Sequence, residues 1–183
     1  MRVLTCLTAA ATLALAACEK PATPPIATEP LPPAATQPSP LDPIACKTAD
    51  LQLKHFSDDA GAGQRHVVYA LTNTGATACT LRGFVTATWF DASGQPLDGV
   101  NVLQSQGQES PGPITVAPAG RAVFDISFTG IQATDKACVT SATLTVTPPA
   151  NTQSIQIDDV IAPCTDHITL NPIRAERPDD AQQ

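Results

Sequence analysis

The sequence predicts an all-β domain, an immunoglobulin-like antiparallel β-sandwich of about seven to nine strands. Two observations carry this prediction. Short runs of β-branched and apolar residues recur through residues 44–174, with turns rich in Gly, Pro and Asn between them. No stretch of about twelve residues shows the 3.6-residue period of an amphipathic helix. The length of this region suits a single hydrophobic core.

The strands can be placed in order along the chain. Residues 67–72 form a β-branched run that ends at turn residues 73–75. Residues 84–90 alternate apolar and small polar side chains, and the turn at 91–96 could return the chain from Leu97 as a partner strand. The same pattern predicts further strands at residues 51–56, 114–116, 122–128, 142–147, 154–157 and 168–170.

The N-terminus, residues 1–17, has the features of a signal peptide. Arg2 precedes an apolar segment, residues 3–14, which is too short to span a bilayer. Residues 15–18 read Leu-Ala-Ala-Cys and resemble the lipobox of bacterial lipoproteins. This resemblance implies that the chain is cut before Cys18 and that Cys18 is acylated with fatty acids such as palmitate.

The number of cysteines favours this interpretation. An ordinary secretory signal is the alternative, because residues 14–16 (Ala-Leu-Ala) also fit a cleavage site. Cys6 leaves with the signal peptide in either case, and a Cys18 without lipid would leave an odd number of thiols. A lipidated Cys18 leaves four cysteines, which can form two disulfides outside the cytoplasm in any of three pairings. These four are Cys46, Cys79, Cys138 and Cys164.

A linker and a tail flank the predicted domain. Residues 18–43 contain the lipidated cysteine and nine of the 18 prolines, which predicts a semi-rigid spacer without helix or sheet. Glu19 follows Cys18, where enteric lipoproteins retained in the inner membrane carry Asp. We therefore expect a lipid-anchored envelope protein, on the outer membrane facing the periplasm or on the cell surface. The polar residues 175–183 predict a disordered tail.

The motifs of the predicted domain resemble a known family. Residues 73–75 (Asn-Thr-Gly) lead into Cys79-Thr80-Leu81-Arg82-Gly83-Phe84, and similar family motifs occur at 91–97, 116–122 and 146–149. The chain is similar here to the bacterial domain of unknown function numbered forty-two thirty-two, whose members are secreted or lipid-anchored β-sandwiches without an established activity. The family has one cysteine pair early and one late. The resemblance thus implies the disulfides Cys46–Cys79 and Cys138–Cys164.

The sequence shows no constellation that predicts a chemical reaction. His55, His66 and His167 lie far apart without metal-ligand spacing, so we interpret them as solvated surface residues. The pairs 58–59 and 158–159 (Asp-Asp) lack the spacing of a calcium loop and are interpreted as solvated turns. No nucleophile-elbow or nucleotide-binding motif occurs. We expect no catalytic residues, no bound metal and no cofactor, and we expect Trp89 to fill the core.

The charge balance restricts the partners. Seventeen Asp and Glu face ten Lys and Arg, a net charge of −7, which disfavours nucleic acid. We expect a monomer that contacts the membrane through its lipid and binds an envelope protein or polymer without catalysis. A purely structural or stress-tolerance role and an enzyme of unknown chemistry are the alternatives. The polar segment 101–113 is the candidate binding surface, the alternative being a mobile loop without a ligand.

Overall fold

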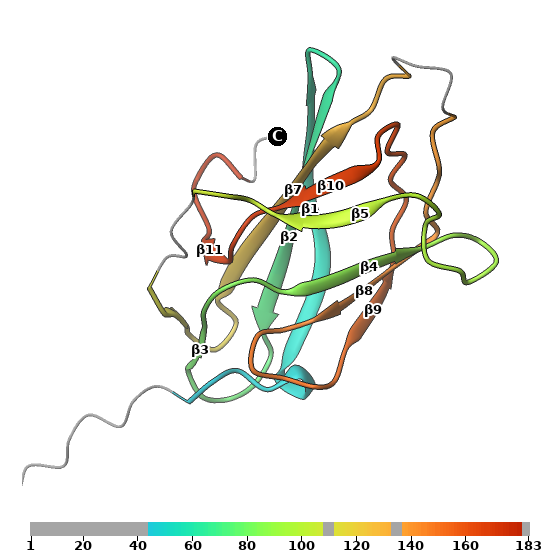
Figure 1. Ribbon diagram of the computed structural model, residues 1–183. Helices are drawn as coiled ribbons and strands as arrows, with labels where there is room; N and C mark the ends of the chain where they lie inside the picture. Colours follow the sequence, from blue (N-terminus) through green and yellow to red (C-terminus); the bar gives the residue numbers. More distant parts are fainter. Residues whose placement is uncertain (1–43, 108–111, 133–136, 181–183) are drawn as a thin grey trace, which may run out of the picture. The chain divides into compact units, whose positions relative to one another are not determined.

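A computed structural model describes residues 44–107, 112–132 and 137–180 (Figure 1). The described residues do not include the predicted signal peptide, Cys18 or the linker 18–43. They also leave out residues 108–111 of the candidate binding segment 101–113. The all-β prediction is confirmed, because the described residues form strands and one short 3-10 helix, η1 (Thr48–Asp50). None of the helices in this part of the chain is long and apolar enough to cross a membrane.

The larger sheet forms one layer of a sandwich. Its path joins β1 (Leu51–Gly61), β2 (Gln64–Asn73), β7 (Arg121–Thr129), β10 (His167–Leu170) and β5 (Asn101–Gln104), and the short β11 (Arg174–Ala175) also pairs with β7. Neighbouring strands are antiparallel except β10 and β5, which are parallel. β5 therefore forms one edge of this sheet and β1 the other.

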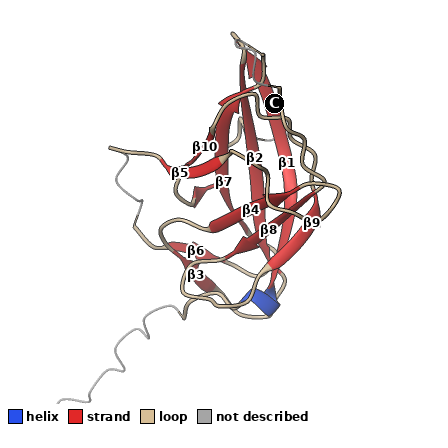
Figure 2. Ribbon diagram, turned by 45° about the vertical axis from the view of Figure 1, so that its right-hand side comes forward, coloured by secondary structure: helices blue, strands red, loops and turns tan. Residues whose placement is uncertain are grey.

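Two smaller sheets form the opposite layer, which lies across the larger sheet in Figure 2. One contains β4 (Thr86–Phe90), β8 (Thr143–Thr147) and β9 (Ile155–Asp158), and the other contains β3 (Cys79–Leu81) and β6 (Ile114–Val116). The alternating side chains of both layers meet in one core. Its largest buried members include Tyr69, Phe124 and Leu144, and Trp89 is 2% exposed, as expected of a core residue.

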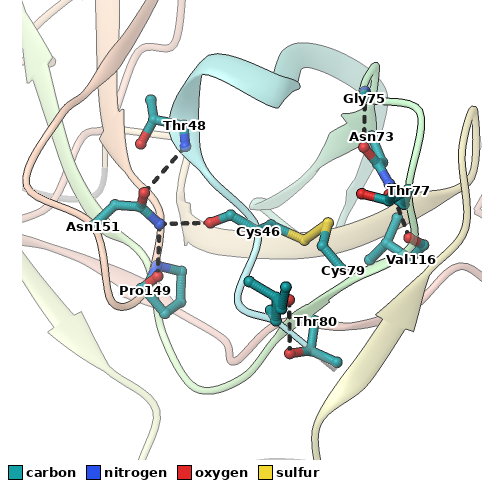
Figure 3. The surroundings of a disulfide bond; sticks show 11 residues. Cys46, Thr48, Asn73, Gly75, Thr77, Cys79, Thr80, Val116, Pro149 and Asn151 are labelled. Atoms are coloured by element: carbon teal, nitrogen blue, oxygen red, sulfur yellow. Dashed lines mark hydrogen bonds between the residues drawn. A yellow bond between two sulfur atoms is a disulfide. The ribbon is translucent and has the colours of Figure 1, made fainter. Parts of the chain in front are cut away.

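Both disulfides implied by the family resemblance are present: Cys46–Cys79 and Cys138–Cys164. Figure 3 shows how Cys46–Cys79 ties the start of the domain to β3. Asn151 reinforces this end, because its amide donates to the carbonyl of Cys46 and accepts from the N–H of Thr48. Asn73 of the family motif closes the adjacent turn by donating to the carbonyls of Thr77 and Val116.

The chain departs from the predicted path after Leu97. The sequence predicts that this segment returns along residues 84–90, but only one bridge, Phe90 to Pro96, joins the two. Gly99, with a φ of 64°, redirects the chain to the other sheet, where β5 pairs with β10. The described residues form eleven strands, more than predicted. β3, β5 and β11 have only two to four residues each, too few for a strand pattern to be recognised in the sequence.

The C-terminal segment also differs from the predicted disordered tail. β11 pairs with β7, and Asp180 is 2% exposed. Arg174 holds it there, because its guanidinium donates to both carboxylate oxygens of Asp180 at 2.7 Å and to Asp125 at 3.2 Å. The sequence shows a polar tail, but these buried partners offset the entropy of ordering it.

Candidate functional site

A buried carboxylate, Asp159, lies inside the sandwich beside the β1 edge. Its Oδ2 accepts hydrogen bonds from the Tyr69 hydroxyl at 2.7 Å and from the Trp89 indole at 2.9 Å. Its Oδ1 lies 3.0 Å from Nδ1 of His55. The side chain of Asp159 is 0% exposed, whereas that of His55 is 37% exposed. Solvent therefore reaches the group through His55, and the carboxylate is held by residues from both layers.

The backbone after β9 places Asp159 in this position. Its N–H donates to the carbonyl of Ala142 at 3.0 Å, and its carbonyl accepts from the Ser141 hydroxyl at 2.8 Å. The same hydroxyl accepts from the N–H of Ile161. The sequence interpretation of 158–159 as a solvated turn is thus wrong for Asp159, although Asp158 is exposed. Two adjacent carboxylates point in opposite directions because strand residues alternate between faces.

An irregularity in β1 adds a second carboxylate to the site. His55 pairs with Tyr69 and Ser57 with Val68, so Phe56 is an extra residue, a β-bulge. Residues three apart in a regular strand face opposite sides. The bulge instead turns His55 and Asp58 to the same side, with Nε2 of His55 3.9 Å from Oδ1 of Asp58. Arg65 of β2 completes the group through its ion pair with Asp58.

These contacts fix the protonation of the site. Because a carboxylate only accepts hydrogen bonds, Nδ1 of His55 carries a hydrogen and Nε2 is the nitrogen left for other partners. The hydrogen bond to Asp159 raises the pKa of His55 above its usual value, against the opposing effect of burial. Burial, with the nearby Asp159 carboxylate, raises the pKa of Tyr69, so its hydroxyl remains a donor.

A pocket of about 370 Å³ opens beside His55. Asp58 and Arg65 form its polar side, and the remaining lining is apolar or glycine: Val67, Phe128, Gly130, Val160, Ile161 and Ala162. Gly130 makes room for Arg65, because a Cβ there would lie 2.5 Å from its Cγ. The lining contains two groups that can act as a general base, His55 and Asp58, but no Ser, Thr, Cys or Lys nucleophile.

The three histidines each contact a different carboxylate. Nε2 of His66 lies 2.9 Å from Asp125, and Nδ1 of His167 lies 2.8 Å from Asp166. Their side chains are 38% and 48% exposed, so the prediction of surface positions holds for both, and their pairing with carboxylates was missed. Within the described ranges, no group of three His, Cys, Asp or Glu side chains could hold a metal ion.

A second feature lies at the opposite edge of the larger sheet. All four residues of β5 are exposed, including Val102 at 37% and Leu103 at 51%. The N–H of Asn101 donates to the carbonyl of Asp166 just before β10, and the N–H of Ser105 donates to the carbonyl of Leu170, the last residue of β10. By the alternation of a strand, the N–H and C=O of Val102 and Gln104 face away from β10. No strand in the described part of the chain pairs with that side of β5.

A groove of about 270 Å³ runs beside β5. One side is β4, which pairs with β8 and, among the described residues, has on its other side the bridge from Phe90 to Pro96 and the hydrogen bond from the N–H of Leu97 to the carbonyl of Trp89. The groove is lined by Ala87, Thr88, Trp89, Pro96, Leu97, Val100, Asn101, Val102 and Ile168. The groove, whose lining residues are mostly apolar but whose exposed surface is about half polar, thus lies between two strand edges. The polar side chains of residues 101–113 predict a binding loop, whereas the position of β5 at a sheet edge follows only from the tertiary structure.

The family comparison agrees with the resemblance seen in the sequence. Residues 46–174 match the model of the family described as Domain of unknown function (DUF4232). The chain belongs to this family. The DUF4232 domain therefore includes both features described above, from His55 to Asp159 and from β4 to β5. A search of curated proteins found no match to the chain.

Proposed function

We propose that this protein is a lipid-anchored component of the cell envelope whose DUF4232 domain binds a partner protein without catalysing a reaction. The observation that carries the binding function is the edge strand β5. Val102 and Leu103 are exposed on it, the N–H and C=O of Val102 and Gln104 face away from β10, and a groove lies beside the strand. Natural sheets protect edges with Lys, Pro, a bulge or a very short strand, and β5, although only four residues long, has no Lys, Pro or bulge. Such an edge is suited to adding a strand from another chain.

A site-specific crosslinking experiment tests this function. A photoreactive residue placed at Leu103 in the native organism should crosslink to one envelope protein. Ile131 is the matched control, since it is apolar, 56% exposed and follows β7, outside the lining of both the groove beside β5 and the His55 pocket. Crosslinking at Leu103 that is no stronger than at Ile131 would contradict a binding role for β5.

The lipid anchor rests on residues 15–18 and on the even number of remaining cysteines. Cys18→Ser should prevent incorporation of labelled palmitate and move the protein from the membrane fraction to the soluble fraction. The two or three acyl chains of a lipoprotein hold a protein durably, so their loss has a large effect. Cys6→Ser is the control and should leave the distribution unchanged. A cleaved Cys18→Ser protein that stays in the membrane would exclude lipid as the anchor.

A second candidate function is favoured by the pocket at His55. A histidine oriented by a buried carboxylate can accept a proton from water, which would suit a hydrolase. The lining has no Ser, Thr, Cys or Lys, so the attacking group in this second candidate function would be a water molecule activated by His55. His55→Gln, compared with His167→Gln, over a panel of ester and amide substrates would test it. Hydrolysis lost only in His55→Gln would place this function ahead of the binding role.

A further inference from the structure

We infer that the partner of β5 is an extended, apolar protein segment flanked by Lys or Arg, which adds a strand to β5 and places alternate side chains in the groove beside Trp89. This inference rests on the proposed binding function and defines the chemistry of the partner. It is drawn from the backbone geometry of β5, from the lining of the groove and from the distribution of charge in the domain.

The backbone of β5 requires an extended partner. Val102 and Gln104 each direct one N–H and one C=O away from β10, spaced by two residues as in a sheet ladder. Only another strand presents donors and acceptors at the same spacing. The side chains of a strand alternate between faces, so every second residue of the partner would face the groove. The groove beside it presents the half-buried Val100 and the exposed Val102 over the buried Leu97 and Ile168, which favours apolar side chains facing it.

The charge distribution selects basic flanks. Residues 83–120 contain no Lys or Arg, and neither do residues 137–173, and together these segments form β4, β5, β6, β8, β9 and β10. Both segments contain acidic residues, among them the exposed Asp98 and Asp166 that adjoin the start of β5. The hydrogen bond from His167 lowers the pKa of Asp166, so this carboxylate remains ionised at neutral pH.

The same charges disfavour a second copy of this chain as the occupant. Two β5 edges paired with each other would bring two sets of acidic residues together in a chain whose net charge is −7. The basic residues of the larger sheet lie on the strands away from β5, at Lys54, Arg65, Arg121 and Arg174. A second copy therefore brings no cation to Asp98 and Asp166 through its own β5 edge.

The experiment measures the affinity of the soluble Cys18→Ser chain for three fluorescent peptides. Each has the same alternating Val and Thr core, and its flanks are Lys, Ser or Glu. We expect the Lys-flanked peptide to bind about tenfold or more tightly than the Glu-flanked peptide at low salt, with the difference shrinking as salt is added. Asp98→Asn combined with Asp166→Asn should reduce this preference, whereas Asp59→Asn, an exposed acid of β1, should not.

Two further variants test the strand addition itself. Leu103→Lys protects the edge and Val102→Pro removes an outward N–H, so both should abolish binding of every peptide. Leu103→Lys keeps an exposed side chain exposed, so it remains informative if Val102→Pro does not fold. If the three peptides bind equally and Leu103→Lys abolishes their binding, the requirement for Lys or Arg flanks is refuted, while strand addition to β5 is supported. Failure of all peptides to bind would overturn both. A dimer that Leu103→Lys dissociates would make a second copy the occupant.

Discussion

Nδ1 of His55 lies 3.0 Å from Oδ1 of Asp159, although the two residues are 104 positions apart in the sequence. The contact joins the edge strand β1 to the segment after β9 and connects the two layers of the sandwich. Tyr69 and Trp89 approach the same carboxylate from β2 and β4. The Asp159 carboxylate therefore accepts hydrogen bonds from residues of three strands, and its removal should destabilise the whole core.

Asp159→Ala should lower the free energy of unfolding by about 3–5 kcal/mol, because a partner is removed from a buried hydrogen-bonded group. The Tyr69 hydroxyl and the Trp89 indole would remain buried without their acceptor. Asp158→Ala is the matched control, and its exposed side chain should contribute within about 0.5 kcal/mol. Urea denaturation of the disulfide-bonded protein measures both. Equal losses in the two variants would refute the role of Asp159.

The stability of the domain should fall as the pH rises through the pKa of His55. The hydrogen bond to Asp159 raises this pKa in the folded state, so protonated His55 stabilises the fold. The contribution is complete below the unfolded pKa of about 6.5 and is lost above the raised folded value. Because His55 is 37% exposed, the effect should be about 1 kcal/mol or less. Denaturation from pH 5 to pH 9 measures it, and His55→Gln should remove this dependence.

Arg174→Ala should release the C-terminal segment from the larger sheet. Arg174 is the cation that pairs with both Asp125 and Asp180, whose side chains are 8% and 3% exposed. Breaking such a pair should lower the free energy of unfolding by about 3 kcal/mol. Carboxypeptidase should also trim the variant faster than the parent. Arg177→Ala is the control, because the Arg177 side chain is exposed. Equal trimming of the two variants would contradict the anchoring role of Arg174.

The ion pairs of Arg174 with Asp125 and Asp180 should break at low pH, when the two carboxylates become protonated. The hydrogen bonds from Arg174 lower the pKa of Asp180. Burial acts to raise the pKa of Asp125, but the hydrogen bonds from His66 and Asn171 lower it further than burial raises it. Stability from these lowered values is present above the unfolded pKa of about 4 and is lost as the pH falls through the folded values. Arg174→Ala should therefore show a weaker acid dependence than the parent between pH 5 and pH 2.

Reduction of the two disulfides should destabilise the domain strongly. They close loops with sequence separations of 33 and 26 residues, for which the chain-entropy model assigns about 3.5 kcal/mol each. Thermal denaturation with and without reductant measures the loss, and a chelator is the control, expected to leave the midpoint unchanged. A midpoint lowered by chelator alone would reveal a metal site. Peptide mapping without reduction checks the pairing, and a Cys46–Cys164 peptide would overturn it.

Most strands of this domain could be predicted because their signals are local. The β-branched and apolar residues of 67–72 and 122–128 mark each segment as a strand by themselves, and β2 and β7 cover both. The cysteine pairing followed from the family resemblance rather than from the residues alone, which left three pairings open. The path after Leu97 could not be predicted, because Gly99 permits several directions and the choice of β10 as partner depends on a strand 66 positions later.

The sequence by itself determined most of the strand segments, the presence of four cysteines in the domain, and the lack of Lys and Arg in residues 83–120. Tertiary structure alone decided that Asp159 is buried while Asp158 is exposed, and that β5 lies at a sheet edge. The physical reason is the range of the interactions. Side-chain alternation and turn preferences act over a few residues, whereas burial of a carboxylate requires donors brought together from distant strands.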